Sequence, residues 1–300
     1  MTTLLAVDWG TTSLRAHRVV DGVVVETRSS SDGILTVAAD GWQDALNRHI
    51  GDWRREEGAA TVLSGMVGSR QGWHEVAYQP LPADAHALAA GAVMIDAATA
   101  EAEWGPVRIL PGLCHRDPAD VMRGEEVQVL GALGALHRQS GRFCLPGTHS
   151  KWVDVDGGRI IGFRTHMTGE VYAALKGHTI LGRLMVGEAD DTAGFAAGVA
   201  QSASTAGLLA DLFGVRARGL LGELPETGLA AYLSGLLIGH ELRSAMATAS
   251  TAEPIVLVGA QTLVERYRRA AELLGLVTHS APETAAALGV WQVALAGGWL

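Results

Sequence analysis

One pattern occurs twice in this chain, and it limits the folds that the chain can adopt. In residues 3–25, three apolar segments are separated by a Gly-Thr turn at Gly10-Thr11-Thr12 and an Asp-Gly turn at Asp21-Gly22. Residues 143–163 repeat this order around Gly147-Thr148-His149-Ser150 and Asp156-Gly157. Apolar runs bounded by such turns predict strands, so each copy is predicted to form a three-stranded meander. The repetition indicates two domains of similar construction.

Both Gly-Thr turns have the chemistry of a phosphate-binding site. Their backbone N–H groups and hydroxyls can donate hydrogen bonds to phosphate oxygens, and glycine permits close approach of the backbone. Either turn alone could be an ordinary turn, but the pair predicts two domains that close on one polyphosphate. Lys151 could neutralise phosphate charge. The predicted phosphate ligands are Gly10, Thr11, Thr12, Gly147, Thr148, His149, Ser150 and Lys151.

Asp8 lies at the end of the first predicted strand, two residues before Gly10. A carboxylate at this point can hold Mg²⁺, directly or through water, beside phosphates. The alternative is an aspartate that only bonds its own backbone in the turn. The second Gly-Thr turn favours the interpretation as a metal ligand.

Two further stretches contain candidates for substrate recognition. A Gly-rich loop, Gly65 to Gly72, follows a short apolar strand; loops on a rigid scaffold often bind substrate, although a flexible connection has the same composition. Arg123, Glu125 and Glu126 lie at the start of a predicted helix. One carboxylate could act as general base toward a substrate hydroxyl, or both could only complement the helix dipole.

The order of predicted elements places a domain boundary near residue 139. Helices are predicted over residues 42–56 and 124–138, and the short polar segment Gln139-Ser140-Gly141 follows the second of them. The second half is predicted to be mainly helical from 168 to 246. Gly259-Ala260 then follows a buried strand, and small residues at this point would let a flat ring lie against the backbone. The predicted domains are 1–139 and 140–300.

Composition excludes several classes of protein. The chain has 300 residues, is 48% hydrophobic and carries a net charge of -9, without the basic patch of a nucleic-acid-binding protein. Cys114 and Cys144 lie in unrelated segments, as expected in a reduced, cytoplasmic protein. The start has no signal peptide, and the apolar residues 285–300 predict a buried helix rather than a membrane span. That helix could serve a core or a dimer interface.

Motifs of other enzymes are missing. The sequence has no Gly-x-x-x-x-Gly-Lys-Ser/Thr, which excludes a P-loop kinase, and no zinc-type His-Glu-x-x-His. Neither a Gly-x-Gly-x-x-Gly after the first strand nor a Gly-x-Ser-x-Gly elbow occurs. A dinucleotide-binding fold and a serine hydrolase are therefore disfavoured.

Taken in order, the motifs resemble the 2-dehydro-3-deoxygalactonokinase family, within the sugar-kinase, Hsp70 and actin fold group. They extend through nearly the whole chain, and those in its middle are more specific to the family than the first Asp-x-Gly-Thr turn. The main ones are Val7-Asp8-Trp9-Gly10-Thr11-Thr12-Ser13-Leu14-Arg15, Gly65-Met66-Val67-Gly68-Ser69, Met122-Arg123-Gly124-Glu125-Glu126, Pro146-Gly147-Thr148-His149-Ser150-Lys151-Trp152 and Thr168-Gly169-Glu170.

The resemblance implies an α/β fold of two ribonuclease H-like domains, with mixed sheets flanked by helices and the active site in the cleft between them. It implies ATP and Mg²⁺, and transfer of the γ-phosphoryl group to the 6-hydroxyl of 2-dehydro-3-deoxy-D-galactonate in galactonate breakdown. Asp8 would hold the metal, Gly259 and Ala260 would bind adenosine, and substrate would be bound by Gly65, Met66, Val67, Gly68, Ser69 and Arg123. Arg123 or the loop would bind the substrate carboxylate.

Several points stay open on the sequence alone. Glu125 is the expected base, by analogy with relatives whose base begins a helix in this region, and Glu126, Asp120 and Asp8 compete with it. A kinase of the same fold could act on keto-deoxygluconate or pantothenate instead. A non-enzymatic switch of the Hsp70 or actin type is a further alternative. The stereochemistry of the acceptor and the oligomeric state are not determined by these motifs.

Overall fold

The computed structural model describes residues 1–57, 59–95, 106–247 and 253–300. Its contacts divide the chain into two compact units. Unit 1 comprises residues 1–141, 153–163 and 281–300, and unit 2 comprises residues 142–152 and 164–280. None of the helices in the described parts is long and apolar enough to cross a membrane.

Unit 1 is built on the six-stranded sheet β3-β2-β1-β4-β7-β6. The predicted first meander forms β1 (Thr3–Trp9), β2 (Leu14–Val20) and β3 (Val23–Ser30). β4 (Ala60–Ser64) runs parallel to β1, β7 (Val107–Ile109) runs parallel to β4, and β6 (Val93–Ile95) pairs with β7 antiparallel. The carboxyl ends of β1 and β4 therefore meet at one edge of the sheet, where the candidate residues Asp8 and Gly65 lie.

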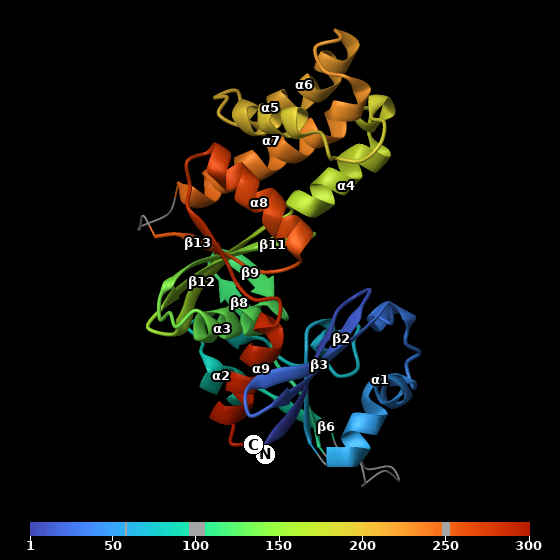
Figure 1. The fold of residues 1–300 in the computed structure, drawn as a ribbon, viewed down its shortest axis with the longest axis vertical. Helices are drawn as coiled ribbons and strands as arrows, with labels where there is room; N and C mark the ends of the chain where they lie inside the picture. Colours follow the sequence, from blue (N-terminus) through green and yellow to red (C-terminus); the bar gives the residue numbers. More distant parts are fainter. Residues whose placement is uncertain (58, 96–105, 248–252) are drawn as a thin grey trace. The chain divides into compact units, whose positions relative to one another are not determined.

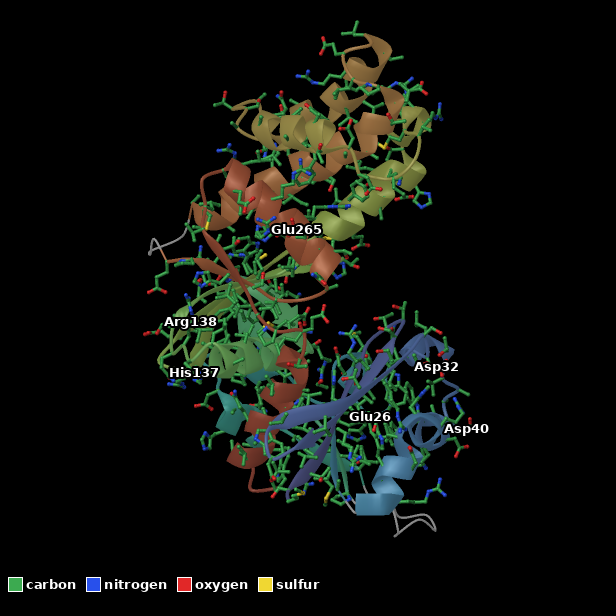
Figure 2. All side chains as sticks on the ribbon, in the orientation of Figure 1. Glu26, Asp32, Asp40, His137, Arg138 and Glu265 are labelled. Carbon is green, nitrogen blue, oxygen red and sulfur yellow. The ribbon has the colours of Figure 1, made fainter. Side chains whose placement is uncertain are left out.

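The core of unit 1 lies between this sheet and helix α1 (Trp42–Glu57). The rings of Trp9 and Trp42 meet edge to face, with centroids 5.6 Å apart. Charged side chains such as Glu26 and Asp40 project outward from the unit (Figure 2). The core therefore supports the sheet next to the edge where Asp8 and Gly65 lie.

Several short elements of unit 1 were not predicted. Helix α2 (Ala85–Ala90) and the three-stranded sheet of β5 (Gln79–Pro80), β8 (Leu113–Arg116) and β9 (Ala119–Met122) fall in segments without clear periodicity. The helix predicted over 124–138 is α3 (Glu125–Ala135).

The C-terminal helix α9 (Ala285–Ala296) belongs to unit 1, although the sequence grouped it with the second domain. Figure 1 shows it beside α3. Glycines explain the close approach: a Cβ on Gly131 would lie 1.8 Å from the carbonyl oxygen of Ala285, and one on Gly289 would lie 1.7 Å from that of Val127. The apolar helix is therefore used in a core.

The second meander is divided between the units, because its residues 153–163 belong to unit 1, and the helical layer belongs to unit 2. The five-stranded sheet has the order β12-β11-β10-β13-β14. Its strands are β10 (Gly141–Leu145), β11 (Ser150–Asp156), β12 (Arg159–His166), β13 (Ile255–Leu257) and β14 (Thr278–Ser280). The helices are α4 (Thr168–His178), α5 (Thr192–Gln201), α6 (Leu208–Leu220), α7 (Glu226–Met246) and α8 (Gln261–Leu273).

Three short 3-10 turns complete the elements: η1 (Ile34–Thr36), η2 (Met66–Gly68) and η3 (Gly182–Leu184). α7 is buried along most of its length, as its apolar sequence requires. The predicted boundary at residue 139 is close to the first division between the units at 141, but the units also exchange segments near residues 153 and 281.

Candidate active site

The candidate site of unit 1 is the carboxyl end of β1. Asp8 is the second-last residue of β1 and lies opposite Ser64 on one neighbouring strand and Arg15 on the other. The Gly10 N–H donates to the carbonyl oxygen of Ser13 at 2.8 Å, which closes the turn after the strand. Thr11 and Thr12 are exposed at its tip. The predicted phosphate turn of unit 1 is therefore accessible.

Two glycines make room for the Asp8 carboxylate. Gly65 follows β4 with φ +91°, and a Cβ there would lie 3.0 Å from Asp8 Oδ1 and 2.9 Å from the carbonyl oxygen of Trp9. Gly124 precedes α3 with φ +106°, and its Cβ would lie 3.2 Å from Gly65 Cα. Positive φ values and missing side chains at both positions let the ends of β1 and β4 meet the start of α3.

The two glutamates that begin α3 have different surroundings. Both oxygens of Glu126 accept from the Gly124 N–H, at 2.9 and 2.8 Å, and its side chain is fully buried. Glu125 is partly exposed, and its Oε2 accepts from the Arg123 N–H at 2.9 Å. Only Glu125 of the pair can therefore reach a substrate. The buried Glu126 carboxyl group instead accepts the hydrogen bond of the Gly124 N–H at the start of α3.

The negative charge of Glu125 acts on the two carboxyl groups near it, those of Asp8 and Glu126. Burial, and then the negative charge of Glu125, raise the pKa of Asp8 to about 6, against an opposing effect of Arg15. Burial and Glu125 also raise the pKa of Glu126 to about 8. Two carboxylates that repel each other beside an open turn form an oxygen site that a divalent cation would stabilise.

Asp120, another predicted competitor for the role of base, lies in β9. Its Oδ1 accepts from the Val121 N–H at 2.8 Å, and it is paired with His115 across the hairpin. Among the candidate bases, the structure brings Glu125 and Asp8 within electrostatic influence of each other.

The Gly-rich loop is folded tightly rather than flexible. Its first half forms η2. Val67, Gly68 and Ser69 are buried, and only Met66 among residues 65–69 is partly exposed. Hydrogen bonds from Gly68 N to Gly65 O and from Ser69 N to Met66 O hold it at 3.1 and 3.0 Å. Any contact with substrate from this loop would therefore come from Met66 or from the backbone.

Arg123 lies beneath the same loop. It is 8% exposed, its Nη2 donates to the carbonyl oxygen of Val76 at 2.8 Å, and its Cζ lies 4.3 Å from the centroid of the Tyr78 ring. Its Nε and Nη1 have no hydrogen-bond partner in the described parts of the chain. A buried guanidinium with unpaired donors is costly, which makes Arg123 a candidate for recognition of an anionic substrate.

The candidate site of unit 2 is its Gly-Thr turn, Gly147 to His149. Thr148 and His149 are exposed, and His149 Nε2 lies 2.5 Å from Glu170 Oε2. The Glu170 N–H donates to the carbonyl oxygen of Thr148 at 3.0 Å. A Cβ on Gly169 would lie 2.5 Å from the carbonyl oxygen of Gly147. The first turn of α4 thus packs directly against the predicted phosphate turn.

Two predicted phosphate ligands point elsewhere. Ser150 is fully buried, with its hydroxyl 2.8 Å from the Tyr267 hydroxyl. Lys151 is 6% exposed, and its Nζ donates to Thr165 Oγ1 at 2.8 Å. Both residues already belong to β11, whose two faces are covered here. Their side chains therefore support the turn, and neither is open to a phosphate in this structure.

A small pocket lies between this turn and α8. Its lining includes Gly147, Gly169, Tyr172, Arg266 and Tyr267. Gly259, with φ +138°, would place a Cβ 3.7 Å from the carbonyl oxygen of Pro146, so the predicted adenosine loop lies beside the turn. Ala260 directly precedes α8 as its N-terminal cap residue.

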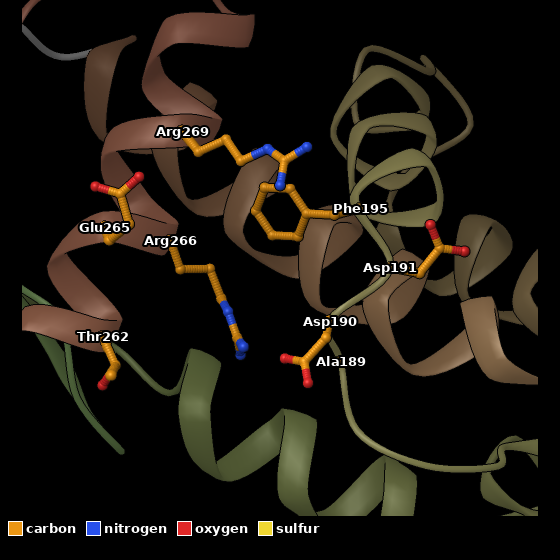
Figure 3. Close-up of a pocket in the computed structure, with 8 residues that line it drawn as sticks. All are labelled: Ala189, Asp190, Asp191, Phe195, Thr262, Glu265, Arg266 and Arg269. Atoms are coloured by element: carbon orange, nitrogen blue, oxygen red, sulfur yellow. The ribbon is translucent and has the colours of Figure 1, made fainter.

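A second pocket, which shares Arg266 with the first, has a volume of about 330 Å³, within the range of small-molecule sites. Figure 3 shows the Arg266 guanidinium and the Asp190 carboxylate pointing into it, with the Phe195 ring behind. In the described parts of the chain, Arg266 has neither a hydrogen bond nor an ion pair. It is therefore available to a ligand.

Sequence reasoning missed three of these residues. Arg15 lies opposite Asp8 and is exposed, and pairing across the predicted hairpin could have found it. Glu170 was part of a quoted motif but received no role. Arg266 gave no signal, because only the fold brings α8 close to residue 190.

Comparison with known proteins shows the family of this chain. The family model for 2-keto-3-deoxy-galactonokinase matches residues 8–293. The chain belongs to this family. It is 36% identical over 293 residues to 2-dehydro-3-deoxygalactonokinase of Escherichia coli K12, and the match covers 97% of each chain.

Structures of other proteins support the fold. A crystal structure of a Sinorhizobium meliloti protein assigned to the same kinase covers 98% of both chains with a TM-score of 0.88 and 36% identity. Component A of (R)-2-hydroxyglutaryl-CoA dehydratase from Acidaminococcus fermentans, 11% identical, matches 99% of each chain with a TM-score of 0.53 and shows the fold alone. The predicted family, the actin-like ATPase fold and the class of enzyme, a sugar-acid kinase, are confirmed. A kinase implies ATP as a substrate.

Proposed function

We propose that this protein transfers the γ-phosphoryl group of ATP to the 6-hydroxyl of 2-dehydro-3-deoxy-D-galactonate. The substrate class follows the names of the relatives with 36% identity. The observation that carries the proposal is the Asp8–Glu125 pair at a glycine-lined edge beside an exposed Gly-Thr turn. Phosphoryl transfer needs mainly positioning and charge neutralisation, and these groups can supply both.

In this proposal Asp8, with Glu125 nearby, would hold Mg²⁺. Magnesium commonly binds one or two carboxylates and completes its shell with water and phosphate oxygens. The ion would neutralise charge on the phosphates.

Glu125 is the proposed general base. Its carboxylate is partly exposed, whereas Glu126 is sealed in the helix start. The Arg123 N–H donates to Glu125 Oε2 at 2.9 Å and orients this carboxylate. Arg15, exposed opposite Asp8, is placed to offset the negative charge of the phosphates.

The substrate carboxylate is assigned to the region of Arg123 and the loop of residues 65–69. Because the Nε and Nη1 atoms of Arg123 have almost no accessible surface, we propose that its charge acts from behind the loop, whose backbone makes the direct contact. Met66 is the side chain of this loop that a substrate can touch.

In unit 2, Gly147, Thr148 and His149 would bind phosphates, and the adenosine would lie beside Gly259 and Ala260, close to this turn. Arg266, which lines both pockets along α8, and Asp190 would lie near it. That both units bind the same ATP molecule stays a prediction from the sequence, as do a cytoplasmic location and the oligomeric state.

The test is ADP release from Mg-ATP by purified protein, with 2-dehydro-3-deoxy-D-galactonate, its gluconate epimer or pantothenate as acceptor. We expect strong stimulation by the galactonate compound alone, and a phosphate on C6 by nuclear magnetic resonance of the product. Stimulation by one of the other two acids only would support kinase activity but would contradict the proposed acceptor. No stimulation by any of the three would contradict the proposal.

A further inference from the structure

A chain of buried polar side chains crosses unit 2 behind the phosphate turn. The Ser150 and Tyr267 hydroxyls are 2.8 Å apart, Tyr267 donates to Glu241 Oε2 at 2.7 Å, and Trp152 Nε1 donates to Glu241 Oε1 at 2.8 Å. Ser150 is fully buried, and the other three are at most 4% exposed. The chain joins β11 to α7 and α8.

The hydrogen bonds of this chain have a fixed direction. A carboxylate can only accept, so the single proton of Tyr267 goes to Glu241, and the Ser150 hydroxyl must donate to the Tyr267 oxygen. Burial and the charge of Glu241 raise the pKa of Tyr267 well above its usual value, so this proton stays in place. Each member of the chain is therefore satisfied in one arrangement only.

Apolar side chains of the same size could often fill such a site without loss of stability. A polar chain instead fixes geometry, because displacing one member leaves a buried partner unsatisfied. Its two ends adjoin the nucleotide site: Ser150 directly follows the turn of Gly147 to His149, and Tyr267 lines the pocket beside Gly147. α8, which carries Tyr267, begins directly after the Gly259-Ala260 loop.

We propose that Ser150, Tyr267 and Glu241 are positioning residues, which lock the phosphate turn to α8 so that the triphosphate and the adenosine are bound at a fixed separation. This proposal rests on the proposed ATP site. It also gives a role to Ser150 other than the one expected from the sequence, since its hydroxyl orients the turn from behind and does not bind phosphate.

The variant Tyr267→Phe keeps the ring that lines the pocket and removes the link between Ser150 and Glu241. We expect the Kd and KM for Mg-ATP to rise about tenfold, which is about 1.4 kcal/mol, while the KM for the acceptor stays within about twofold. Ser150→Ala should weaken ATP binding in the same way. The double variant should lose little more than either single one, because both break the same link.

Tyr232→Phe is the matched control. Tyr232 lies in α7 and is 1% exposed, and its hydroxyl has no partner in the described parts of the chain. Removing this hydroxyl should leave ATP binding unchanged. Thermal unfolding of every variant would show whether a loss of binding reflects a loss of folding, and Ser150→Ala provides the test should Tyr267→Phe not fold.

Calorimetric titration with Mg-ATP and steady-state kinetics for both substrates distinguish the outcomes. Wild-type protein that binds no ATP would overturn the proposed function and this inference with it. If wild type binds ATP and both Tyr267→Phe and Ser150→Ala bind it with the same affinity, the positioning role alone would be overturned. An equal rise in KM for both substrates, or the same loss in Tyr232→Phe, would also contradict it.

Discussion

Replacing Asp8 by asparagine should make the protein more stable and inactive at the same time. In the folded chain the pKa of Asp8 is raised from 3.8 to about 6 by burial and by Glu125. One pKa unit is equivalent to about 1.4 kcal/mol, so ionising Asp8 costs up to about 3 kcal/mol of folding free energy. Because Asp8 is only half-buried, solvent screening reduces this, and roughly 1–3 kcal/mol is expected.

The sign of the pH dependence follows from the direction of the shift. A carboxyl group with a raised pKa in the folded state contributes its full stability below its unfolded pKa, near 3.8, and that stability is lost as the pH rises through about 6. Asparagine has no charge to lose. The free energy of unfolding of Asp8→Asn should therefore exceed that of wild type above pH 6 and approach it near pH 4.

Urea unfolding of both proteins at several pH values between 4 and 8, without metal or nucleotide, measures this difference. Asp44→Asn is the control, because Asp44 is exposed in the first turn of α1 and should show no comparable pH dependence. Kinase activity should fall at least a hundredfold in Asp8→Asn only. A variant that is less stable than wild type at pH 7 to 8, or a gain that is independent of pH, would refute the reasoning.

Three further perturbations test other parts of the site. Glu125→Gln should lower kcat by roughly two to four orders of magnitude with little change in ATP affinity, and near-normal turnover in a coupled ADP assay would reject Glu125 as base. Gly169→Ala should weaken Mg-ATP binding, because its Cβ would lie 2.5 Å from the carbonyl oxygen of Gly147, whereas Gly177→Ala on the same helix meets no atom within 4 Å and should bind normally in calorimetry. Burial and Arg15 lower the pKa of His17 to about 4, so wild type should lose up to about 3 kcal/mol of stability as the pH falls from 7 to 4. His17→Gln should flatten that part of the pH dependence measured by urea unfolding. An unchanged pH dependence in this variant would contradict the assignment to His17.

The sequence was informative where a single local conformation serves the function. The Gly-Thr turns need free backbone N–H groups and positions without large side chains, so they are visible as short motifs. Asp8 could be placed at the end of β1 because a strand that runs into such a turn has a defined end. Family, fold and class of enzyme were therefore predictable from the motifs and their order.

It was less informative where neighbouring residues differ only in the direction they face. Glu125 and Glu126 both begin α3, but successive residues of a helix point about 100° apart, and α3 is apolar on most sides beyond them. No periodicity could show which glutamate faces the core. Ser150 likewise continues the turn in sequence but is the first residue of a buried strand in space.

The unfavourable features of unit 1 are concentrated at the proposed active site. Asp8 and Glu125 repel each other, and Arg123 is buried with two nitrogens that have no hydrogen-bond partner in the described parts of the chain. Gly65 and Gly124 keep positive φ values that place these groups together. Such features lower the stability of the free protein, and a ligand that offsets them stabilises the folded state by mass action. A divalent cation would neutralise the negative charges of Asp8 and Glu125. A substrate carboxylate would offset the buried positive charge of Arg123. The charges that make folding less favourable are therefore the ones through which this kinase would bind its ligands.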